Sequence, residues 1–414
     1  MNSKDIKVAV IFWRLGPYHH ARLNAAGQRM RVAGVESCGM EGTNAWEKIE
    51  GADSFRKVTL TERHVDNRHW RRELQRKMFQ ALDDLKPQAV AIPGWSLVDA
   101  LVALLWCLLT QTPAIVMSDS TALDAPRVSW RERIKKRVVS LCSSALVAGT
   151  RHREYVMQLG MPADRIFLGY DVVDNGYFAA RAEAIRKQKA ENRDRFGLPE
   201  NYFLVSGRFI EVKNFPCLIE AYARYRTKCH DQRPQATDKR PWELVLLGDG
   251  PLSEELRAKR EKLGVRDWVR MPGFKQYPEL PNYYGLASAF VLPSISETWG
   301  LVVNEAMASG LPVLVSDRCG CAPDLVRDGT NGFTFDPYSV EEIASAMLRV
   351  WKMEDGELKR MGAESSRIIA AWGPERFVSG LELAVVKALE SGPRAAKPLD
   401  RLLLRALISC GKST

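Results

Sequence analysis

Two glutamates, Glu297 and Glu305, are separated by seven residues within the segment 293–306. Gly300 lies between them at the expected start of a helix, which would place Glu297 in a loop and Glu305 on the second turn. Both carboxylates could then face one pocket. The backbone N–H groups of Gly300 and Leu301 would lie at the positive end of that helix, which suits a phosphate. The alternative is that both glutamates are exposed helix acids.

A basic loop lies upstream of these acids, directly after an apolar run at 202–205. It carries Arg208 and Lys213, five positions apart. A guanidinium offers a planar pair of donors to phosphate oxygens and an ammonium offers a compact charge, so the two together suit a diphosphate. The alternative interpretation is a solvated basic loop.

Two glycine turns also follow expected strands. Gly248, Asp249 and Gly250 close one strand and open a helix, and Gly273 with Phe274 follows another strand, where a backbone edge could meet a planar base. Such turns are common for steric reasons, so each is weak evidence by itself.

Short apolar runs recur along the chain, and most are followed by a helical pattern. Strands that alternate with helices are typical of βαβ units around a parallel sheet that is buried on both faces. Ligands of such sheets bind beyond the carboxyl ends of the strands, where the acids and the basic loop lie. The expected strands are residues 6–12, 88–92, 114–117, 145–148, 202–205, 243–247, 269–271, 289–292 and 313–316. The expected helices are residues 96–109, 130–141, 152–159, 214–226, 252–263, 280–286 and 301–309.

We therefore predict an α/β protein in which two Rossmann-like domains face each other across a cleft. The polar segment 181–200 is expected to connect the two domains. The polar segment 228–241 is expected to be a surface insertion.

The second half of the chain resembles the GT-B retaining glycosyltransferases of family 4, also called glycosyltransferase group 1. The E-x7-E motif, the Gly-Arg-x4-Lys loop and the two glycine turns stand in that family's order. The resemblance is strong over residues 201–372 and looser before them. It implies an N-terminal acceptor-binding domain at 1–180, with helices at 374–414 packing back on it, and a C-terminal nucleotide-sugar-binding domain at 181–373.

The resemblance also implies a role for each residue of the donor site. Arg208 and Lys213 would hold the diphosphate, and Glu305 would bind the ribose hydroxyls. Glu297 would bind sugar hydroxyls, while backbone amides at the helix start contact the distal phosphate. The expected donor-binding set is Gly16, Arg208, Lys213, Gly248, Gly273, Phe274, Glu297, Gly300, Leu301 and Glu305.

The implied chemistry is the departure of a nucleoside diphosphate from an oxocarbenium-like sugar. Cations and preorganised amides stabilise the growing negative charge most in the transition state. The chain has no Asp-x-Asp pair, so we expect a metal-independent reaction with no cofactor, in which the nucleotide sugar is a substrate. The expected catalytic residues are Glu297, Asp119, Arg208 and Lys213.

One departure of the first half from the family concerns a candidate catalytic residue. Asp119 aligns where relatives often carry a histidine, and it could orient a donor hydroxyl, accept the acceptor's proton or cap the next helix. Gly16 matches a glycine that the family places near the donor phosphates. Residues expected on the acceptor side are Tyr18, His19, His20 and Trp95. Adjacent histidines at a helix start are, alternatively, surface residues.

The 414 residues include 60 Lys and Arg against 50 Asp and Glu, a formal charge of +10. The excess lies towards the two ends of the chain, and no recognition-helix or RNA-platform signature accompanies it, which disfavours nucleic acid as a partner. Tryptophan beside basic residues, at 68–77 and 130–137, and an amphipathic tail at 399–408 suit an anionic membrane surface. The alternative is a set of solvated helix faces.

Two features bear on the compartment. The longest apolar run, 100–109, is too short to cross a bilayer. No apolar leader precedes the first strand, so we expect a cytoplasmic protein, peripheral at the inner face of the cytoplasmic membrane.

The function that the sequence favours is retaining transfer of a sugar from a UDP- or GDP-sugar to a lipid-linked or growing saccharide of a bacterial polysaccharide or envelope glycan. One alternative is transfer to a small soluble acceptor. Another is a catalytically idle GT-B partner subunit. The sequence predicts neither the sugar, the linkage nor the oligomeric state.

Overall fold

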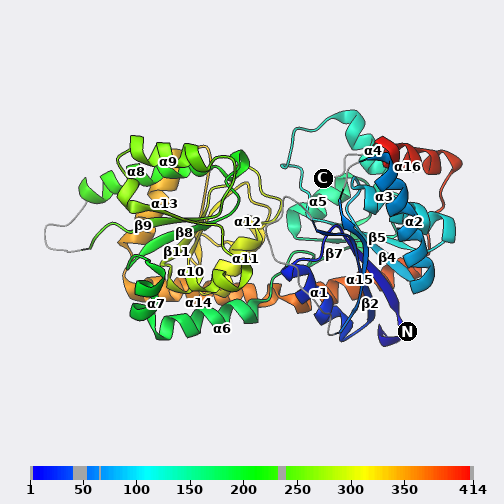
Figure 1. The fold of residues 1–414 in the computed structure, drawn as a ribbon, viewed down its shortest axis with the longest axis horizontal. Helices are drawn as coiled ribbons and strands as arrows, with labels where there is room; N and C mark the ends of the chain where they lie inside the picture. Colours follow the sequence, from blue (N-terminus) through cyan, green and yellow to red (C-terminus); the bar gives the residue numbers. More distant parts are fainter. Residues whose placement is uncertain (1–2, 41–53, 65–66, 232–238, 411–414) are drawn as a thin grey trace. The chain divides into compact units, whose positions relative to one another are not determined.

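The computed structural model describes residues 3–40, 54–64, 67–231 and 239–410 (Figure 1). The chain forms two compact units, Met1–Val173 with Trp372–Thr414, and Asp174–Ala371. Each unit contains a parallel sheet flanked by helices, so the predicted α/β class with two Rossmann-like domains is confirmed.

The first sheet has seven parallel strands in the order β3-β2-β1-β4-β5-β6-β7. The sequence did not predict β2, β3 or β7. Gly34, Glu36 and Gly39 interrupt the apolar pattern of β2, β3 is a polar edge strand, and β7 has three residues. The strands are β1 Lys7–Phe12, β2 Arg31–Met40, β3 Arg56–Arg63, β4 Ala89–Pro93, β5 Ala114–Ser118, β6 Ser144–Val147 and β7 Ile166–Leu168.

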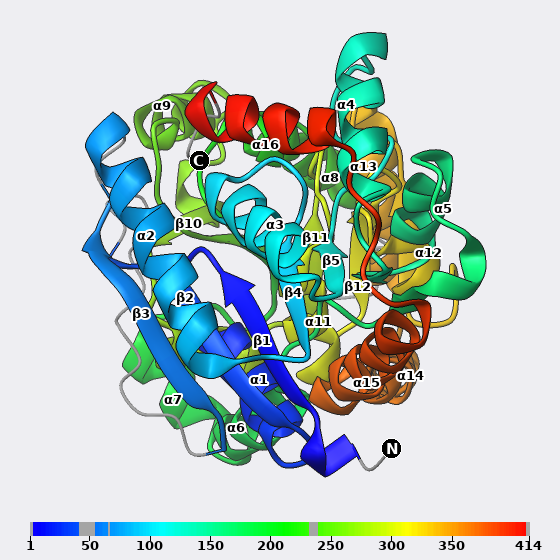
Figure 2. The same cartoon turned by 90° about the vertical axis from the view of Figure 1, so that its right-hand side faces the viewer.

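Helices cover both faces of this sheet (Figure 2). Val8 and Val10 of β1 pack towards α1 and α15, whereas Ala9 and Ile11 pack towards α2 and α3, because alternate side chains of a strand point to opposite faces. The apolar run in α3 is buried as far as Leu108, with α2 and α16 packed against that helix. The helices are α1 Pro17–Gly27, α2 Arg68–Leu85, α3 Val98–Thr110, α4 Ser129–Val139, α5 Thr150–Gln158, α15 Pro374–Ser391 and α16 Pro398–Cys410.

The second sheet has six parallel strands in the order β10-β9-β8-β11-β12-β13. The sequence located the first five to within about two residues and missed β13. The strands are β8 Tyr202–Ser206, β9 Glu243–Leu247, β10 Val269–Gly273, β11 Ala289–Leu292, β12 Val313–Ser316 and β13 Gly332–Phe335. The helices are α6 Asn175–Lys187, α7 Lys189–Phe196, α8 Phe215–Asp231, α9 Ser253–Lys262, α10 Leu280–Leu286, α11 Leu301–Ala308, α12 Ala322–Leu325, α13 Val340–Lys352 and α14 Asp355–Ile369.

The boundary between the units differs from the expected one. We expected a break after residue 180 and a polar connection over 181–200, but most of that segment belongs to α6 and α7. Asp174 caps α6 by accepting the Tyr177 N–H at 2.9 Å, and α6 buries Phe178 and Ala182 while it packs against α10. The charged residues of the segment lie on the opposite side of an amphipathic helix, which is why they resembled a linker.

The expected surface insertion at 228–241 lies partly outside the described residues. Its first four residues continue α8. Within the described part of the chain, no helix is long and apolar enough to span a bilayer.

Candidate functional site

Three loops at the carboxyl edge of the second sheet are joined by backbone hydrogen bonds. The Phe209 N–H donates to the Asp249 carbonyl at 2.9 Å, and the Leu252 N–H donates to the Phe209 carbonyl at 3.0 Å. The Gly248 N–H donates to the Gly273 carbonyl at 3.1 Å. The loops after β8, β9 and β10 therefore form one fixed surface.

Glycine is required where the first two loops cross. A Cβ on Gly248, whose φ is +144°, would lie 1.9 Å from the Gly207 carbonyl oxygen. A Cβ on Gly250, with φ of +155°, would lie 2.7 Å from the Phe209 oxygen. Glycine is therefore needed in the Gly-Asp-Gly turn for more than chain reversal. The loop that carries Arg208 passes so close that a side chain would not fit.

Lys213 and Glu297, predicted to bind phosphate and sugar respectively, form an ion pair with each other. Lys213 ends a short 3-10 turn after β8, and Glu297 lies in the loop after β11. The Ile295 N–H donates to the Val212 carbonyl at 2.9 Å, which ties these two loops together. Both side chains are largely buried, and the Ser294 hydroxyl donates to the same Glu297 oxygen at 3.2 Å.

The other cation of the basic loop is in a different situation. The side chain of Arg208 is exposed, and it forms no hydrogen bond or ion pair within the described residues. Its guanidinium is available to an anionic ligand at the edge where Lys213 is already paired.

Glu305 is fully buried on α11, one turn into the helix. Its Oε2 accepts the hydroxyl of Tyr284 at 2.7 Å. Burial and the neighbouring carboxylate raise the pKa of Tyr284 well above its ordinary value, so this hydroxyl stays a donor. The interpretation of both glutamates as exposed helix acids is therefore wrong.

The start of α11 has the geometry predicted from the glycine between the two acids. Gly300 is the N-cap residue with φ of +104°, and a Cβ there would lie 3.4 Å from the Glu297 Cγ. The N–H groups of Gly300 and Leu301 donate to no other described residue. Trp299 next to them is buried, and its indole N–H donates to the Asn304 side chain at 2.9 Å, which anchors the loop.

Gly273 and Phe274 end β10 on the same edge. Gly273 has φ of +82°, and no atom lies within 4 Å of the point that a Cβ would occupy there, so its surface is open. The Phe274 ring is exposed. Together they leave an open backbone and an aromatic face beside the joined loops.

The loop after β1 in the first unit holds its own amides. The Gly16 N–H donates to His19 Nδ1 at 3.1 Å, and the Leu15 N–H donates to Glu36 Oε2 at 3.1 Å. Burial, with a smaller effect of Arg22, lowers the pKa of His19 to about 3, so its ring is neutral near pH 7. His19 therefore positions Gly16 in this structure.

The remaining residues expected on the acceptor side are mostly covered. His20 is buried against Phe55, with ring centroids 5.5 Å apart, and Tyr18 is half-buried. Trp95 is buried in the core, edge-on to Tyr155. His20 and Trp95 are thus covered in this structure, and their place on the acceptor side stays a prediction. The alternative that both histidines are surface residues does not hold for His20, which is buried.

Asp119 follows β5 and is half-buried. It does not cap the next helix, because α4 starts ten residues later with Val128 as its cap residue. Asp119 lies near Tyr170, and burial together with the charges of Asp171 and Asp119 raises the pKa of that phenol.

Comparisons with known proteins bear on the second unit most directly. Residues 187–367 match the family model described as "Glycosyl transferases group 1". This segment, here called the group 1 domain after the family model that it matches, makes up most of the second unit. The match leaves the finer assignment to family 4 open.

Several curated relatives are similar to part of the chain. The chain is 28% identical over 261 residues to the "Alpha-D-kanosaminyltransferase" of Streptomyces kanamyceticus, covering 63% of each chain. It is 30% identical over 275 residues to the "D-inositol 3-phosphate glycosyltransferase" of Thermobifida fusca, covering 64% of this chain and 60% of the relative. It is 29% identical over 192 residues to the "GDP-mannose-dependent alpha-(1-6)-phosphatidylinositol monomannoside mannosyltransferase" of Mycobacterium tuberculosis, covering 44% and 47%. These alignments thus span about half to three fifths of the relatives' lengths.

Solved structures match the whole fold. A glycosyltransferase from Rickettsia africae superposes with a TM-score of 0.71 at 11% identity, covering 92% of this chain and 98% of the other. HepE from Anabaena in complex with UDP superposes with a TM-score of 0.66 at 17% identity, covering 91% and 98%. The predicted GT-B fold is confirmed.

Some residues near these sites were not found from the sequence. Arg22 on α1 is buried and forms an ion pair with Asp171 at 3.0 Å. Glu36 on β2 forms an ion pair with Lys57 at 3.2 Å and accepts the Thr59 hydroxyl at 2.6 Å. An arginine within the apolar face of a helix and a glutamate within a strand are the signals that could have marked them.

Among the described residues, no three His, Cys, Asp or Glu side chains are placed to share a metal ion.

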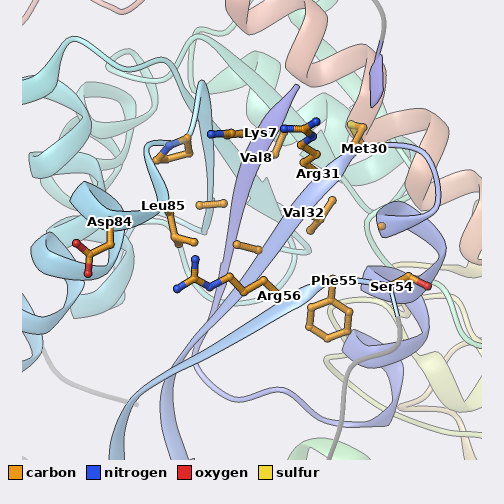
Figure 3. A pocket seen from close by; sticks show the side chains of 14 residues that line it. Lys7, Val8, Met30, Arg31, Val32, Ser54, Phe55, Arg56, Asp84 and Leu85 are labelled. Atoms are coloured by element: carbon orange, nitrogen blue, oxygen red, sulfur yellow. The ribbon is translucent and has the colours of Figure 1, made fainter. Parts of the chain in front are cut away.

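A pocket of about 620 Å³ in the first unit is lined by the first residues of β1, β2 and β3, including Lys7, Arg31 and Arg56 (Figure 3). It lies at the amino edge of that sheet, opposite the edge that carries Gly16.

Proposed function

We propose that the protein is a retaining glycosyltransferase of family 4 that moves a sugar from a UDP- or GDP-sugar to a lipid-linked or growing saccharide of a bacterial polysaccharide or envelope glycan. One observation carries the donor part of this proposal. Two cations and two carboxylates lie at one edge of the second sheet, where ligands of parallel sheets bind. Arg208, Lys213 and Glu297 lie on loops there, and Glu305 lies on the first turns of α11.

The ion pair suggests how donor binding proceeds. In the free protein Lys213 neutralises Glu297. A diphosphate competes for that ammonium, and the exposed Arg208 supplies a second cation to the same group. As Lys213 turns to phosphate, the Glu297 carboxylate becomes free to accept sugar hydroxyls.

The leaving group then gains negative charge as the anomeric bond breaks. Arg208, Lys213 and the Gly300 and Leu301 amides are placed to stabilise that charge in the transition state. Glu305, whose carboxylate accepts the Tyr284 hydroxyl, is proposed to bind the ribose hydroxyls. Because protein cations supply this stabilisation, we propose that the reaction needs no metal ion.

The acceptor part of the proposal is supported by where the charge lies. The first unit has 32 Lys and Arg against 22 Asp and Glu, whereas the second has 28 of each. A basic first unit suits an acceptor that is presented at an anionic membrane, and the name of the relative from Mycobacterium tuberculosis includes phosphatidylinositol monomannoside.

Transfer to a small phosphorylated acceptor is the second candidate. The relative from Thermobifida fusca is named for D-inositol 3-phosphate, and the same basic unit would attract a free phosphate ester. An idle partner subunit would turn over neither kind of acceptor.

One experiment tests the reaction class. The protein is incubated with UDP- and GDP-sugars, lipid extracts and sugar phosphates, with and without EDTA, and the anomeric configuration of the product is read by NMR. We expect the donor's configuration to be retained and the rate to be unchanged by EDTA. An inverted product, or a rate abolished by EDTA and restored by magnesium, would contradict the proposal.

A further inference from the structure

Helix α16 has two apolar faces, and one of them is uncovered. Leu404 and Ile408 are buried against the first unit, where α16 packs on α3 and α2. Leu399 and Leu402 lie on another side of the helix and are 73% and 59% exposed. A helix that only covered a core would need one apolar stripe, so the second stripe calls for another explanation.

The exposed stripe belongs to a helix that is fixed at both ends. Asp400 accepts the Lys397 N–H at 2.7 Å and forms a two-pronged ion pair with Arg137 of α4. Arg71 of α2 donates to the Ser409 carbonyl at 2.8 Å. The leucines are therefore presented by a docked helix.

Exposed cations surround the two leucines. Arg401 and Arg405 are exposed on α16. The neighbouring helix α4, which lies beside α16 in both views (Figures 1 and 2), adds an exposed basic series and Trp130, which is 58% exposed. That series is Arg131, Arg133 and Lys136.

The acids of these two helices do not offset this charge. Asp400 is buried under Arg137, and Glu132 is paired with Lys135 and accepts the Tyr155 hydroxyl at 2.9 Å. The exposed side of α4 and α16, here called the α4–α16 face, thus combines apolar side chains with unpaired basic groups.

We propose that the α4–α16 face binds the surface of an anionic membrane. Leu399, Leu402 and Trp130 enter the boundary between headgroups and acyl chains, and the surrounding Arg and Lys side chains contact lipid phosphates. The anionic membrane as a partner deepens the proposed function. The identity of the lipid-linked acceptor rests on that proposed function.

A second copy of the chain fits this face less well. In a twofold contact the basic side chains of this face would meet the same basic face of the other copy, and like charges across an interface are unfavourable. Two leucines and a tryptophan also cover far less than the roughly 800 Å² per partner of a stable interface. Charge complementarity favours the anionic surface.

Vesicle flotation with the full chain tests the proposal. Wild-type protein is expected to float with vesicles that contain anionic phosphatidylglycerol and to stay down with pure phosphatidylcholine. Leu399→Ser combined with Leu402→Ser is expected to lower the bound fraction at least tenfold. Arg401→Gln with Arg405→Gln is expected to lower binding about fivefold per arginine at low salt.

A matched control lies on α15. Leu383 and Val386 are 55% and 40% exposed there, but Glu382 and Glu390 flank them. Leu383→Ser with Val386→Ser removes similar apolar area from the same unit and is expected to leave flotation unchanged. Thermal unfolding of both double variants shows whether each is folded.

The outcomes separate this face from the catalytic proposal. Equal flotation of the folded α16 variant and wild type, or no wild-type binding to anionic vesicles, would overturn the membrane face. A wild-type dimer that the α16 variant loses, measured by light scattering, would assign the face to self-association instead. Flotation that depends on Leu399 and Leu402 supports the face even if no lipid acceptor is glycosylated, in which case only the proposed acceptor fails.

Discussion

At the scale of single residues, the contact between Lys213 and Glu297 is the most informative feature of the site. It couples a cation suited to phosphate with a carboxylate suited to sugar hydroxyls before any donor is present. We expect Glu297→Gln to lower kcat about 100-fold or more, because an amide binds and orients the sugar less well in the transition state. Donor KM should stay equal or fall, since Lys213 is released for the diphosphate. Steady-state kinetics measures both constants.

An exposed glutamate of the same unit provides the control. Glu255 on α9 is exposed, and Glu255→Gln should leave kcat and KM as in wild type. A Glu297→Gln enzyme with wild-type kcat would show that this carboxylate is not part of the reaction.

A second residue-scale prediction concerns stability and pH. Asp99 is fully buried, where its carboxylate accepts the Ser37 hydroxyl at 2.9 Å and the Ala100 N–H at 2.8 Å, and burial raises its pKa to about 6. The folded state therefore holds this proton more tightly than the unfolded chain. Its contribution to stability is fully present below about pH 4 and is lost as the pH rises through 6.

Asp99→Asn removes that titration and should change the pH profile in a defined direction. The free energy of unfolding of Asp99→Asn, relative to wild type, should increase by about 2 kcal/mol between pH 4 and pH 7. His19 acts in the opposite sense, since it stays neutral when folded, but it is common to both proteins and cancels. Urea unfolding across this range measures the difference, and a constant difference would contradict the assignment.

At the scale of elements, the loops after β8 and β9 are held at a distance that excludes a side chain. Gly248→Ala places a methyl group 1.9 Å from the Gly207 carbonyl oxygen and in a backbone region that favours glycine. We expect it to lower the free energy of unfolding by about 3 kcal/mol or more and to weaken nucleotide binding, because the loop of Arg208 must move.

Gly356→Ala is the matched control for this element. Gly356 lies in α14 with nothing within 4 Å of a Cβ, so alanine there should change stability by no more than about 1 kcal/mol. Equal unfolding midpoints and nucleotide affinities for the two variants would mean that the loops are not packed as described.

The sequence predicted the buried elements well and the polar ones poorly. Strands such as β8 and β11 are short, fully buried apolar runs, which periodicity reveals. Strand β3 and helices α6 and α7 carry many charges on exposed sides, so they resembled loops or a linker.

The site was predictable where a motif places its own residues. The E-x7-E motif predicted Glu297 in a loop and Glu305 on the helix that starts after Gly300, and the structure has both there. Other contacts join residues that are far apart in the chain. Glu297 pairs with Lys213, and Glu36 accepts the Leu15 N–H of the loop after β1. Only the order of strands in each sheet brings such residues together.

At the scale of the whole molecule, the two units differ in charge as well as in content. The whole formal excess of +10 belongs to the first unit, and the second, which contains the group 1 domain, is neutral. This division fits the proposed function, in which the cations of the second unit bind one diphosphate and the basic first unit binds the acceptor. Raising the salt concentration should therefore weaken membrane binding strongly and nucleotide binding less.

The proposed donor reaction is measured by the release of nucleoside diphosphate from a panel of UDP- and GDP-sugars in the presence of lipid and soluble acceptors. Wild-type protein should consume one donor at a rate that depends on acceptor, and Glu297→Gln should run at about 1% of that rate or less. If no donor is consumed above the blank, the proposed transferase reaction is contradicted. If Glu297→Gln consumes donor as fast as wild type, the role of Glu297 is contradicted.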